Sequence, residues 1–261
     1  MVSSLKNGKI FMNKIDFFKN KYVLVTGSSS GIGFEIAKDF LKRGCYVGVH
    51  YNKNKKGAEN LRKLGHKNKC RLFKSDFSNS KSILKLWSDF CKWSKNRVDF
   101  LINNAGYAKP IDFNKLSEKE WDKVLTINLK STFLLSKLAM KIMSQKKNGR
   151  IINISSGGWQ YGGGPKSVHY SVSKAAIEAL TFATAKIGVK NNVLVNAIRP
   201  GATKTDFHRK SMGRKNLIAR TNLVPLKRMA HPDEISNAVM FLCDQKSSFI
   251  TNSVLDVRGG E

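Results

Sequence analysis

The chain has 261 residues, of which 41% are hydrophobic and 25% charged, a composition typical of a folded globular protein and unlike that of a disordered chain. Its net charge of +29 could attract an acidic partner, but lysine and arginine are scattered without an aromatic-interleaved basic stripe, so we do not expect nucleic-acid binding. Four cysteines without a CxxC pair indicate no zinc site and fit the reducing cytoplasm, and no apolar run approaches the roughly 20 residues of a membrane span.

Strand-like and helix-like segments alternate along the chain, which predicts an α/β domain of Rossmann type: a doubly wound parallel sheet with helices on both faces, in three α/β/α layers. We predict strands at 21–27, 45–51, 70–76, 98–106, 149–156, 192–201 and 253–260. We predict helices at 33–44, 57–65, 80–94, 117–146 and 231–245, and one that opens at 169. We expect residues 1–20 to be an N-terminal extension of a single domain at 21–261. Residues 202–230 lack periodicity and are expected to form a lid.

The first strand runs into the turn TGSSSGIG (26–33), which contains Gly27, Gly31 and Gly33. Glycine lets a backbone pass close to a pyrophosphate, and the helix that follows offers free N–H groups and the positive end of its dipole. A tight strand-to-helix turn without a ligand would use the same residues. The motif therefore predicts a nucleotide site only together with its companions.

The helix that opens at residue 169 carries Tyr170 and Lys174 four positions apart, so that both lie on one helix face. An ammonium close to a phenol favours the phenolate and lowers the phenol's pKa from about 10. Such a phenol can donate its proton to the oxygen on which negative charge develops when a hydride adds to a carbonyl. Alone, the two residues would more commonly be a surface pair.

The GxxxGxG turn, NNAG (103–106), Ser156, Tyr170 and Lys174 together resemble the short-chain dehydrogenase/reductase family, and the resemblance covers residues 21–260. It implies an oxidoreductase that interconverts a carbonyl and a secondary alcohol with a nicotinamide cofactor. Tyr170 would then be the proton donor, Ser156 would polarise the substrate, and Lys174 would also bind the nicotinamide ribose.

Two further residues of this set have alternatives. Asn128 matches the asparagine that holds a water in the family's proton relay, but it could instead cap a kink within its helix. Ser155 precedes Ser156, and because side chains alternate along a strand only one of the two can face the site. The resemblance favours Ser156.

The resemblance also implies a set of cofactor contacts. They are Gly27, Ser29, Ser30, Gly31, Ile32, Gly33, Tyr51, Asn52, Lys53, Asp76, Phe77, Asn103, Asn104, Ala105, Gly106, Tyr170, Lys174, Pro200, Gly201 and Thr203. The second strand ends in VHYNKNKK without a carboxylate before Glu59, so we favour NADP(H) over NAD(H). Ser30, however, stands where many NADP-dependent relatives carry a basic residue. Asp76 resembles the residue that takes the adenine amino group, although it could simply cap the next helix.

The pattern, including residues 226–260, resembles the branch that contains 3-oxoacyl-carrier-protein reductases of fatty acid biosynthesis. A basic surface would attract an acidic carrier protein. Two features favour instead a specialised reductase for a sugar or secondary-metabolite ketone. They are the substrate loop with Gly158, Trp159 and Gln160, and a basic lid group, His208, Arg209, Lys210, Arg214 and Lys215.

A third possibility is a catalytically idle nucleotide-binding regulator. The complete set of serine, tyrosine, lysine and asparagine disfavours it, because an idle protein has no chemical reason to keep all four. The resemblance further implies a homotetramer or homodimer that packs through the long helices.

Overall fold

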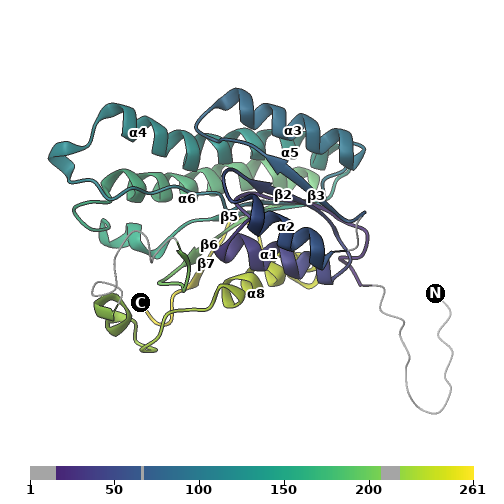
Figure 1. Ribbon diagram of the computed structural model, residues 1–261. Helices are drawn as coiled ribbons and strands as arrows, with labels where there is room; N and C mark the ends of the chain where they lie inside the picture. Colours follow the sequence, from purple (N-terminus) through teal and green to yellow (C-terminus); the bar gives the residue numbers. More distant parts are fainter. Residues whose placement is uncertain (1–15, 66–67, 207–217) are drawn as a thin grey trace, which may run out of the picture.

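The computed structural model describes residues 16–65, 68–206 and 218–261, which form one sheet between two layers of helices (Figure 1). The strands are β1 (Tyr22–Val25), β2 (Tyr46–Tyr51), β3 (Cys70–Lys74), β4 (Phe100–Asn103), β5 (Gly149–Ile154), β6 (Val193–Pro200) and β7 (Val254–Val257). The main helices are α1 (Gly31–Lys42), α2 (Lys55–Leu64), α3 (Ser80–Ser94), α4 (Glu118–Leu125), α5 (Ser131–Gln145), α6 (Val168–Gly188) and α8 (Pro232–Cys243). Short 3-10 turns include η1 (Phe113–Lys115) and η3 (Gly157–Tyr161).

The strands pair in the order β3-β2-β1-β4-β5-β6-β7, and every pair is parallel. The chain winds outward from β1 to β3, then crosses to the other side of β1 and continues from β4 to β7. This confirms the predicted doubly wound sheet. The crevice at the reversal, beyond the carboxyl ends of β1 and β4, is where such sheets bind ligands.

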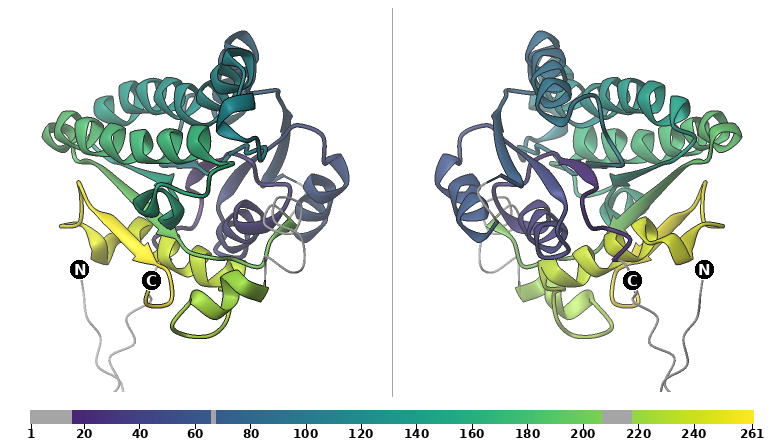
Figure 2. Two further views of the ribbon diagram at one scale, coloured as in Figure 1. Left: turned by 90° about the vertical axis from the view of Figure 1, so that its left-hand side faces the viewer. Right: turned by 90° about the vertical axis from the view of Figure 1, so that its right-hand side faces the viewer.

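Helices α1, α2 and α8 cover one face of the sheet, and α3, α5 and α6 cover the other (Figures 1 and 2). The strands bury apolar side chains on both faces, as parallel strands between helices do. Ile36 and Phe40 of α1 belong to the first core, and Phe90 of α3 and Leu135 of α5 belong to the second. Full burial of one such side chain contributes about 1.5–3 kcal/mol, and the two cores together hold the strand ends in place around the crevice.

The packed domain begins earlier than the sequence suggested. Phe18 has no solvent exposure and lies in the first core, where its ring centroid is 6.0 Å from that of Phe40 and 5.6 Å from that of Phe100. Residues 16–20 are therefore part of the domain and not of an extension, because an aromatic cluster at this position closes the base of the sheet. Residues 1–15 lie outside the described part.

The predicted helix at 117–146 is interrupted. Between α4 and α5 the residues Thr126–Lys130 form a π-helical turn, η2. The hydroxyls of Ser131 and Thr132 donate to the carbonyls of Ile127 and Asn128, which satisfies carbonyls that the wider turn takes out of the regular ladder. The turn places Asn128 in the interior.

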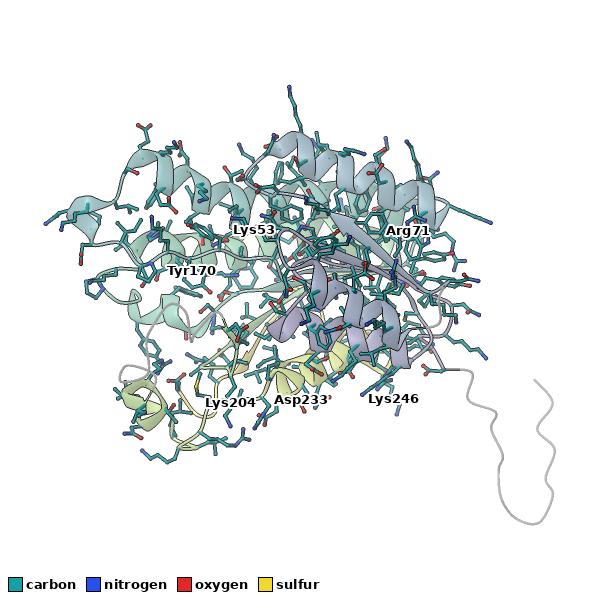
Figure 3. All side chains as sticks on the ribbon, viewed as in Figure 1. Lys53, Arg71, Tyr170, Lys204, Asp233 and Lys246 are labelled. Atoms are coloured by element: carbon teal, nitrogen blue, oxygen red, sulfur yellow. The ribbon has the colours of Figure 1, made fainter. Side chains whose placement is uncertain are left out.

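The predicted lid lies partly outside the described residues. Within the described part, residues 218–223 are helical and lie beside the C-terminus (Figure 2), where Arg220 Nη2 donates to Glu261 Oε2 at 2.8 Å. Among the described helices, none is both long and apolar enough to cross a membrane. Figure 3 shows the basic side chains Lys53, Arg71, Lys204 and Lys246 at four separate places in this view.

Candidate active site

A cavity of about 630 Å³ opens at the carboxyl ends of the strands, at the point where the strand order reverses. Its wall contains every predicted cofactor residue except Asn103, together with the predicted catalytic residues Ser156, Tyr170 and Lys174. Asn128 and the substrate-loop residues do not line it. Residues of the wall that the sequence did not indicate are His50, Asn54, Ser75, Ser78, Tyr107, Lys123, Ile127, Ile154, Thr205 and Asp206.

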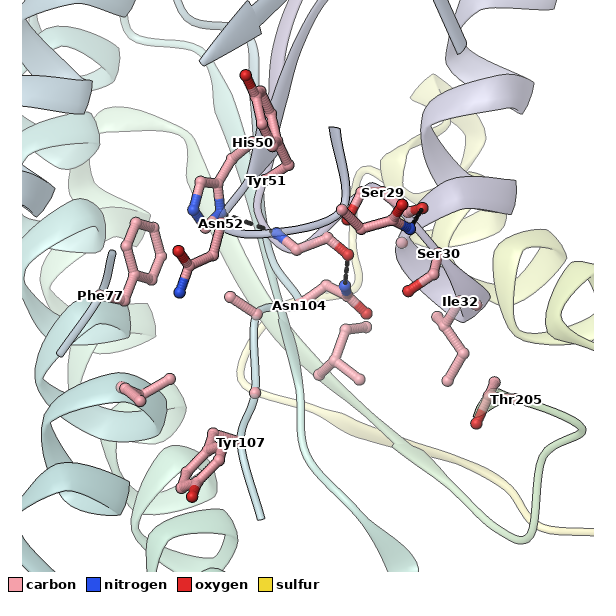
Figure 4. Close-up of a pocket in the computed structure, with 18 of the residues that line it drawn as sticks. Ser29, Ser30, Ile32, His50, Tyr51, Asn52, Phe77, Asn104, Tyr107 and Thr205 are labelled. Carbon is pink, nitrogen blue, oxygen red and sulfur yellow. Dashed lines mark hydrogen bonds between the residues drawn. The ribbon is translucent and has the colours of Figure 1, made fainter. Parts of the chain in front are cut away.

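The turn between β1 and α1 depends on its glycines. Gly27 and Gly31 have φ values of 62° and 56°, in the left-handed region where glycine carries no steric penalty. A Cβ on Gly33 would lie 2.3 Å from Asn104 Nδ2 and 2.5 Å from the Gly27 carbonyl oxygen. Asn104 Nδ2 donates to the carbonyl of Thr26 at 2.9 Å and to that of Gly27 at 3.1 Å, the second of which Figure 4 shows. The turn is thus closed by direct contact between the first helix and the NNAG segment.

Helix α1 begins at the cavity wall, and neither a side-chain cap nor an acidic residue of its first turn offsets the positive end of its dipole. Its N-cap, Ser30, makes no side-chain capping bond, and its first turn contains no acidic residue. Ser29, Ser30 and Ile32 line the cavity here (Figure 4). Because an uncapped helix N-terminus presents N–H donors and partial positive charge, these residues fit the diphosphate of a dinucleotide.

The buried imidazole of His50 is hydrogen-bonded to the glycine turn. Its Nδ1 accepts a hydrogen bond from the Gly27 N–H at 3.0 Å (Figure 4), so Nε2 carries the proton and donates to the Ser75 carbonyl at 3.1 Å. Burial lowers the pKa of His50 to about 4, which keeps this tautomer neutral at physiological pH. The ring also stacks on Phe77 with centroids 4.0 Å apart. The sequence feature that could have indicated a role for His50 is its place as a polar residue inside the apolar run YVGVHY (46–51).

The end of β2 forms the cavity wall next to the glycine turn. Asn54 caps α2 by accepting from the Gly57 N–H and donates to the Ser29 carbonyl at 2.8 Å. Lys53 is exposed at the rim. Glu59, the first carboxylate after β2, pairs with Arg62 at 2.7 Å and is not part of the wall. This end of the cavity therefore presents amides and an ammonium, and no carboxylate from β2.

Asp76 lies at the wall beyond β3 and does not cap α3, whose N-cap is Asn79. Its carboxylate accepts from the backbone N–H and the hydroxyl of Ser78 at 2.9 and 2.8 Å. These hydrogen bonds hold the pKa of Asp76 below its usual value. The capping alternative is therefore wrong, and the carboxylate is ionised at the cavity wall.

Ser156, Tyr170 and Lys174 meet where β5 ends beside α6. The Tyr170 hydroxyl is hydrogen-bonded to the Ser156 side chain. Lys174 Nζ lies 5.7 Å from the centroid of the Tyr170 ring and donates to the Ile154 carbonyl at 2.7 Å. The helical spacing of four residues places both side chains on the face of α6 that looks into the cavity.

The acid–base properties of this trio differ from the expectation. Burial raises the pKa of Tyr170 to about 12, and the hydrogen bond with Ser156 offsets only part of that rise. Burial also lowers the pKa of Lys174 to about 8. The expected net lowering of the Tyr170 pKa is therefore wrong for this geometry, because burial disfavours the charged form of both groups and outweighs the neighbouring lysine. At neutral pH the phenol keeps its proton and can donate it.

The structure distinguishes the two adjacent serines. Ser155 is buried and its hydroxyl donates toward α6, 2.6 Å from Glu178 Oε1 and 3.1 Å from the Lys174 carbonyl. Ser156 points the other way, toward Tyr170. Alternation along the strand end therefore brings Ser156 to the phenol, as the resemblance favoured.

Asn128 is fully buried within η2, behind the cavity wall. Its Oδ1 accepts from the Tyr107 N–H at 2.8 Å, and its Nδ2 donates to the Tyr107 carbonyl at 3.0 Å and to Ser173 Oγ at 2.9 Å. The amide thus fixes the backbone of Tyr107, which does line the cavity. The prediction that Asn128 holds a relay water does not follow from this side-chain arrangement.

One expected cofactor contact needs correction. Asn103 is buried and its side-chain amide donates to Ser136 of α5 and Asn153 of β5, so Asn104 and not Asn103 belongs to the cavity wall. The predicted basic lid group at 208–215 lies outside the described residues.

Two side chains of the substrate loop make polar contacts within the protein. The indole N–H of Trp159 donates to Glu178 Oε1 at 2.6 Å, and the guanidinium carbon of Arg199 lies 5.4 Å from the Trp159 ring centroid. Gln160 Oε1 accepts from Arg258 at 2.6 Å. Trp159 and Gln160 are therefore held by the protein itself, and the sequence offered no signal for these long-range partners.

Comparisons with known proteins agree with this geometry. The family model described as "Enoyl-(Acyl carrier protein) reductase" matches residues 27–261. The 3-oxoacyl-(acyl-carrier-protein) reductase FabG of Buchnera aphidicola is 33% identical over 93% of this chain and 97% of its own length. The 3alpha-hydroxysteroid dehydrogenase of Mediterraneibacter gnavus is 31% identical over 92% of this chain and 96% of its own. A solved short-chain dehydrogenase/reductase family protein superposes with a TM-score of 0.82 at 31% identity, covering 93% of this chain and 97% of that one.

The doubly wound sheet and the tyrosine-lysine site at its switch point define an oxidoreductase of the Rossmann class. The chain belongs to the short-chain dehydrogenase/reductase family. It is accordingly an NAD(P)-dependent dehydrogenase or reductase.

Proposed function

We propose that this protein is an NADP(H)-dependent reductase that converts a carbonyl group to a secondary alcohol, with Tyr170 as the proton donor. One observation carries the proposal: the hydrogen-bonded Ser156 and Tyr170 and the buried Lys174 share one cavity with the uncapped N-terminus of α1. The glycine turn would hold the diphosphate of the cofactor. Asp76 and Phe77 would border its adenine.

The chemistry divides simply between cofactor and protein. A nicotinamide held in the cavity would supply a hydride to the carbonyl carbon, so that negative charge would develop on the carbonyl oxygen. Tyr170 transfers its phenolic proton to that oxygen, and the Ser156 hydroxyl donates a hydrogen bond to it. Lys174 lies beside the ring of Tyr170, where its charge stabilises the phenolate left after the transfer.

The preference for NADP(H) rests on the end of β2, where Lys53 lines the cavity and the first carboxylate after the strand, Glu59, pairs with Arg62 outside the wall. Lys53→Glu is expected to raise the KM for NADPH about tenfold or more, the size of one charge-assisted hydrogen bond, and to leave the KM for NADH little changed or lower. Initial rates with both cofactors measure this.

Lys63→Glu is the matched control, since it makes the same charge change on an exposed residue at the far end of α2. An equal loss of NADPH affinity in both variants would mean that the overall charge acts and that Lys53 makes no specific contact.

For the substrate we propose a 3-oxoacyl thioester carried by an acidic carrier protein. The Buchnera relative is named for that reaction, and the net charge of +29 would steer an acidic partner. A ring ketone is the second candidate, because the steroid dehydrogenase is almost equally similar.

The first experiment follows NADPH oxidation by the purified protein with a short 3-oxoacyl thioester and, in parallel, with a cyclic ketone. We expect saturable turnover with the thioester and slower turnover with NADH. Turnover with the cyclic ketone alone would move the substrate to the second candidate. NADPH binding without any turnover would favour the idle regulator.

We also propose that the protein assembles as a homotetramer or homodimer. Helices α5 and α6 expose Phe133, Phe182 and Ile187 at 44%, 40% and 63%. Contact between copies would remove these side chains from water.

A further inference from the structure

Glu178 is a buried carboxylate for which the proposed reaction has no direct use. It lies on α6, one turn after Lys174 and two turns after Tyr170. Four donors meet it: Ser155 Oγ and Trp159 Nε1 at Oε1, both at 2.6 Å, and Arg199 through Nε at 2.9 Å and Nη2 at 2.6 Å. A buried charge is retained only where it is paired and hydrogen-bonded, and this one is fully occupied.

The contacts continue beyond Arg199 across the ends of β6 and β7. Arg199 Nη1 donates to both carboxylate oxygens of Asp256, at 3.1 and 3.0 Å. Asp256 also pairs with Arg258 Nε at 2.7 Å, and Arg258 Nη1 donates to Gln160 Oε1 at 2.6 Å. The four charges alternate in sign along this path and sum to zero.

Both ends of this chain of ion pairs contact the turn η3, which directly follows Ser156. Trp159 is held at one end by Glu178, and Gln160 is held at the other by Arg258. Arg258 also packs against Gly157, where a Cβ would lie 2.6 Å from its Cδ. We call Glu178, Arg199, Asp256 and Arg258 the charge circuit.

The charge circuit contacts backbone segments next to the proposed catalytic residues. Ser155, which Glu178 binds, is adjacent to Ser156, and its hydroxyl also lies 3.1 Å from the Lys174 carbonyl. The residue after Ser156 contacts Arg258, and the residue after Arg199 is Pro200, which lines the cavity. The backbone on each side of Ser156 is therefore tied to one set of ion pairs.

We propose that Glu178 is a positioning residue for the reductase reaction, which through the charge circuit sets the place of Ser156 relative to Tyr170 and holds the substrate loop off the cavity. This inference rests on the proposed function. It predicts an effect on the chemical step, because a small displacement of a hydroxyl that serves the reacting oxygen is costly. It predicts a smaller effect on NADPH binding, because among the described residues the glycine turn and the end of β2 make no hydrogen bond or ion pair with the charge circuit, which meets the cofactor wall near Pro200 and Gly201.

The test uses Glu178→Gln and Trp159→Phe. The side-chain amide introduced by Glu178→Gln turns an N–H donor toward groups that donated to the carboxylate. Trp159→Phe removes the indole N–H together with part of the ring, and it leaves Glu178 paired with Arg199. We expect kcat for the thioester to fall about tenfold or more in Glu178→Gln and by a smaller factor in Trp159→Phe. The dissociation constant for NADPH, followed by cofactor fluorescence, should change by a much smaller factor than kcat in either variant.

Glu59→Gln, which breaks the partly exposed pair with Arg62 on α2, is the matched control and should keep the wild-type kcat. A lower melting temperature with unchanged kcat in both test variants would show a purely structural role and overturn the inference. If Glu178→Gln does not fold, an unchanged kcat in Trp159→Phe overturns it by itself. Wild-type protein without turnover refutes the proposed function and this inference together, whereas equal turnover in wild type and variants refutes the inference alone.

Discussion

Replacing Tyr170 with phenylalanine is expected to lower kcat for NADPH-dependent carbonyl reduction by about 10²- to 10⁴-fold, the range that a positioned general acid contributes. The substitution removes one oxygen and keeps the ring that packs beside Lys174. The Tyr170 pKa of about 12 means that the phenol holds its proton throughout the neutral range, so the wild-type group is a proton donor in every molecule. Stopped-flow or steady-state loss of NADPH absorbance measures the effect.

Measuring NADPH binding distinguishes the loss of the proton donor from disruption of the whole cofactor site. The dissociation constant of the Tyr170→Phe variant should stay near that of the wild type, because the diphosphate end of the cavity is unaltered. Tyr46→Phe is the matched control: its ring stacks on Tyr22 at the opposite end of β2, and the variant should retain full activity. A wild-type kcat in the Tyr170→Phe variant would show that another group is the proton donor.

The sequence was sufficient for the order and type of the elements, because strand-length β-branched runs alternate with helical periodicity. Boundaries were less certain, since they depend on caps. Helix α1 begins at Gly31 where 33 was expected, and α2 begins at Lys55 where 57 was expected, because Asn54 caps it. The π-turn at 126–130 has a local sequence like that of any helix and depends on the contacts of Asn128 with Tyr107 and Ser173.

The candidate site was predictable where short motifs hold the chemistry, as in the glycine turn and the Tyr170–Lys174 pair. It was not predictable where tertiary packing decides the partner. His50 meets Gly27 from 23 residues away, and Arg199 meets Asp256 from 57 residues away. The pKa of Tyr170 was misjudged for the same reason, since burial is a property of the whole fold and outweighs the neighbouring lysine.

Gly33→Ala is expected to weaken NADPH binding, with the dissociation constant raised by at least about tenfold, or about 1.4 kcal/mol. The added methyl group would lie 2.3 Å from Asn104 Nδ2 and 2.5 Å from the Gly27 carbonyl oxygen, far inside normal contact. Neither atom can move without a cost in free energy. The Gly27 oxygen is part of the backbone, and Asn104 Nδ2 is held by its hydrogen bonds to the carbonyls of Thr26 and Gly27. The helix N-terminus and the turn must therefore separate, which moves the N–H donors that fit the diphosphate.

Overpacking of this kind also lowers the free energy of unfolding by about 1–3 kcal/mol, so thermal unfolding should be measured beside cofactor titration. Gly164→Ala is the control, since a Cβ on exposed Gly164 meets no atom within 4 Å, and it should leave both quantities unchanged. A folded Gly33→Ala protein with wild-type NADPH affinity would show that the contact of α1 with the turn does not shape the diphosphate site. Loss of binding in a folded variant instead ties cofactor affinity to that one contact, independently of Tyr170.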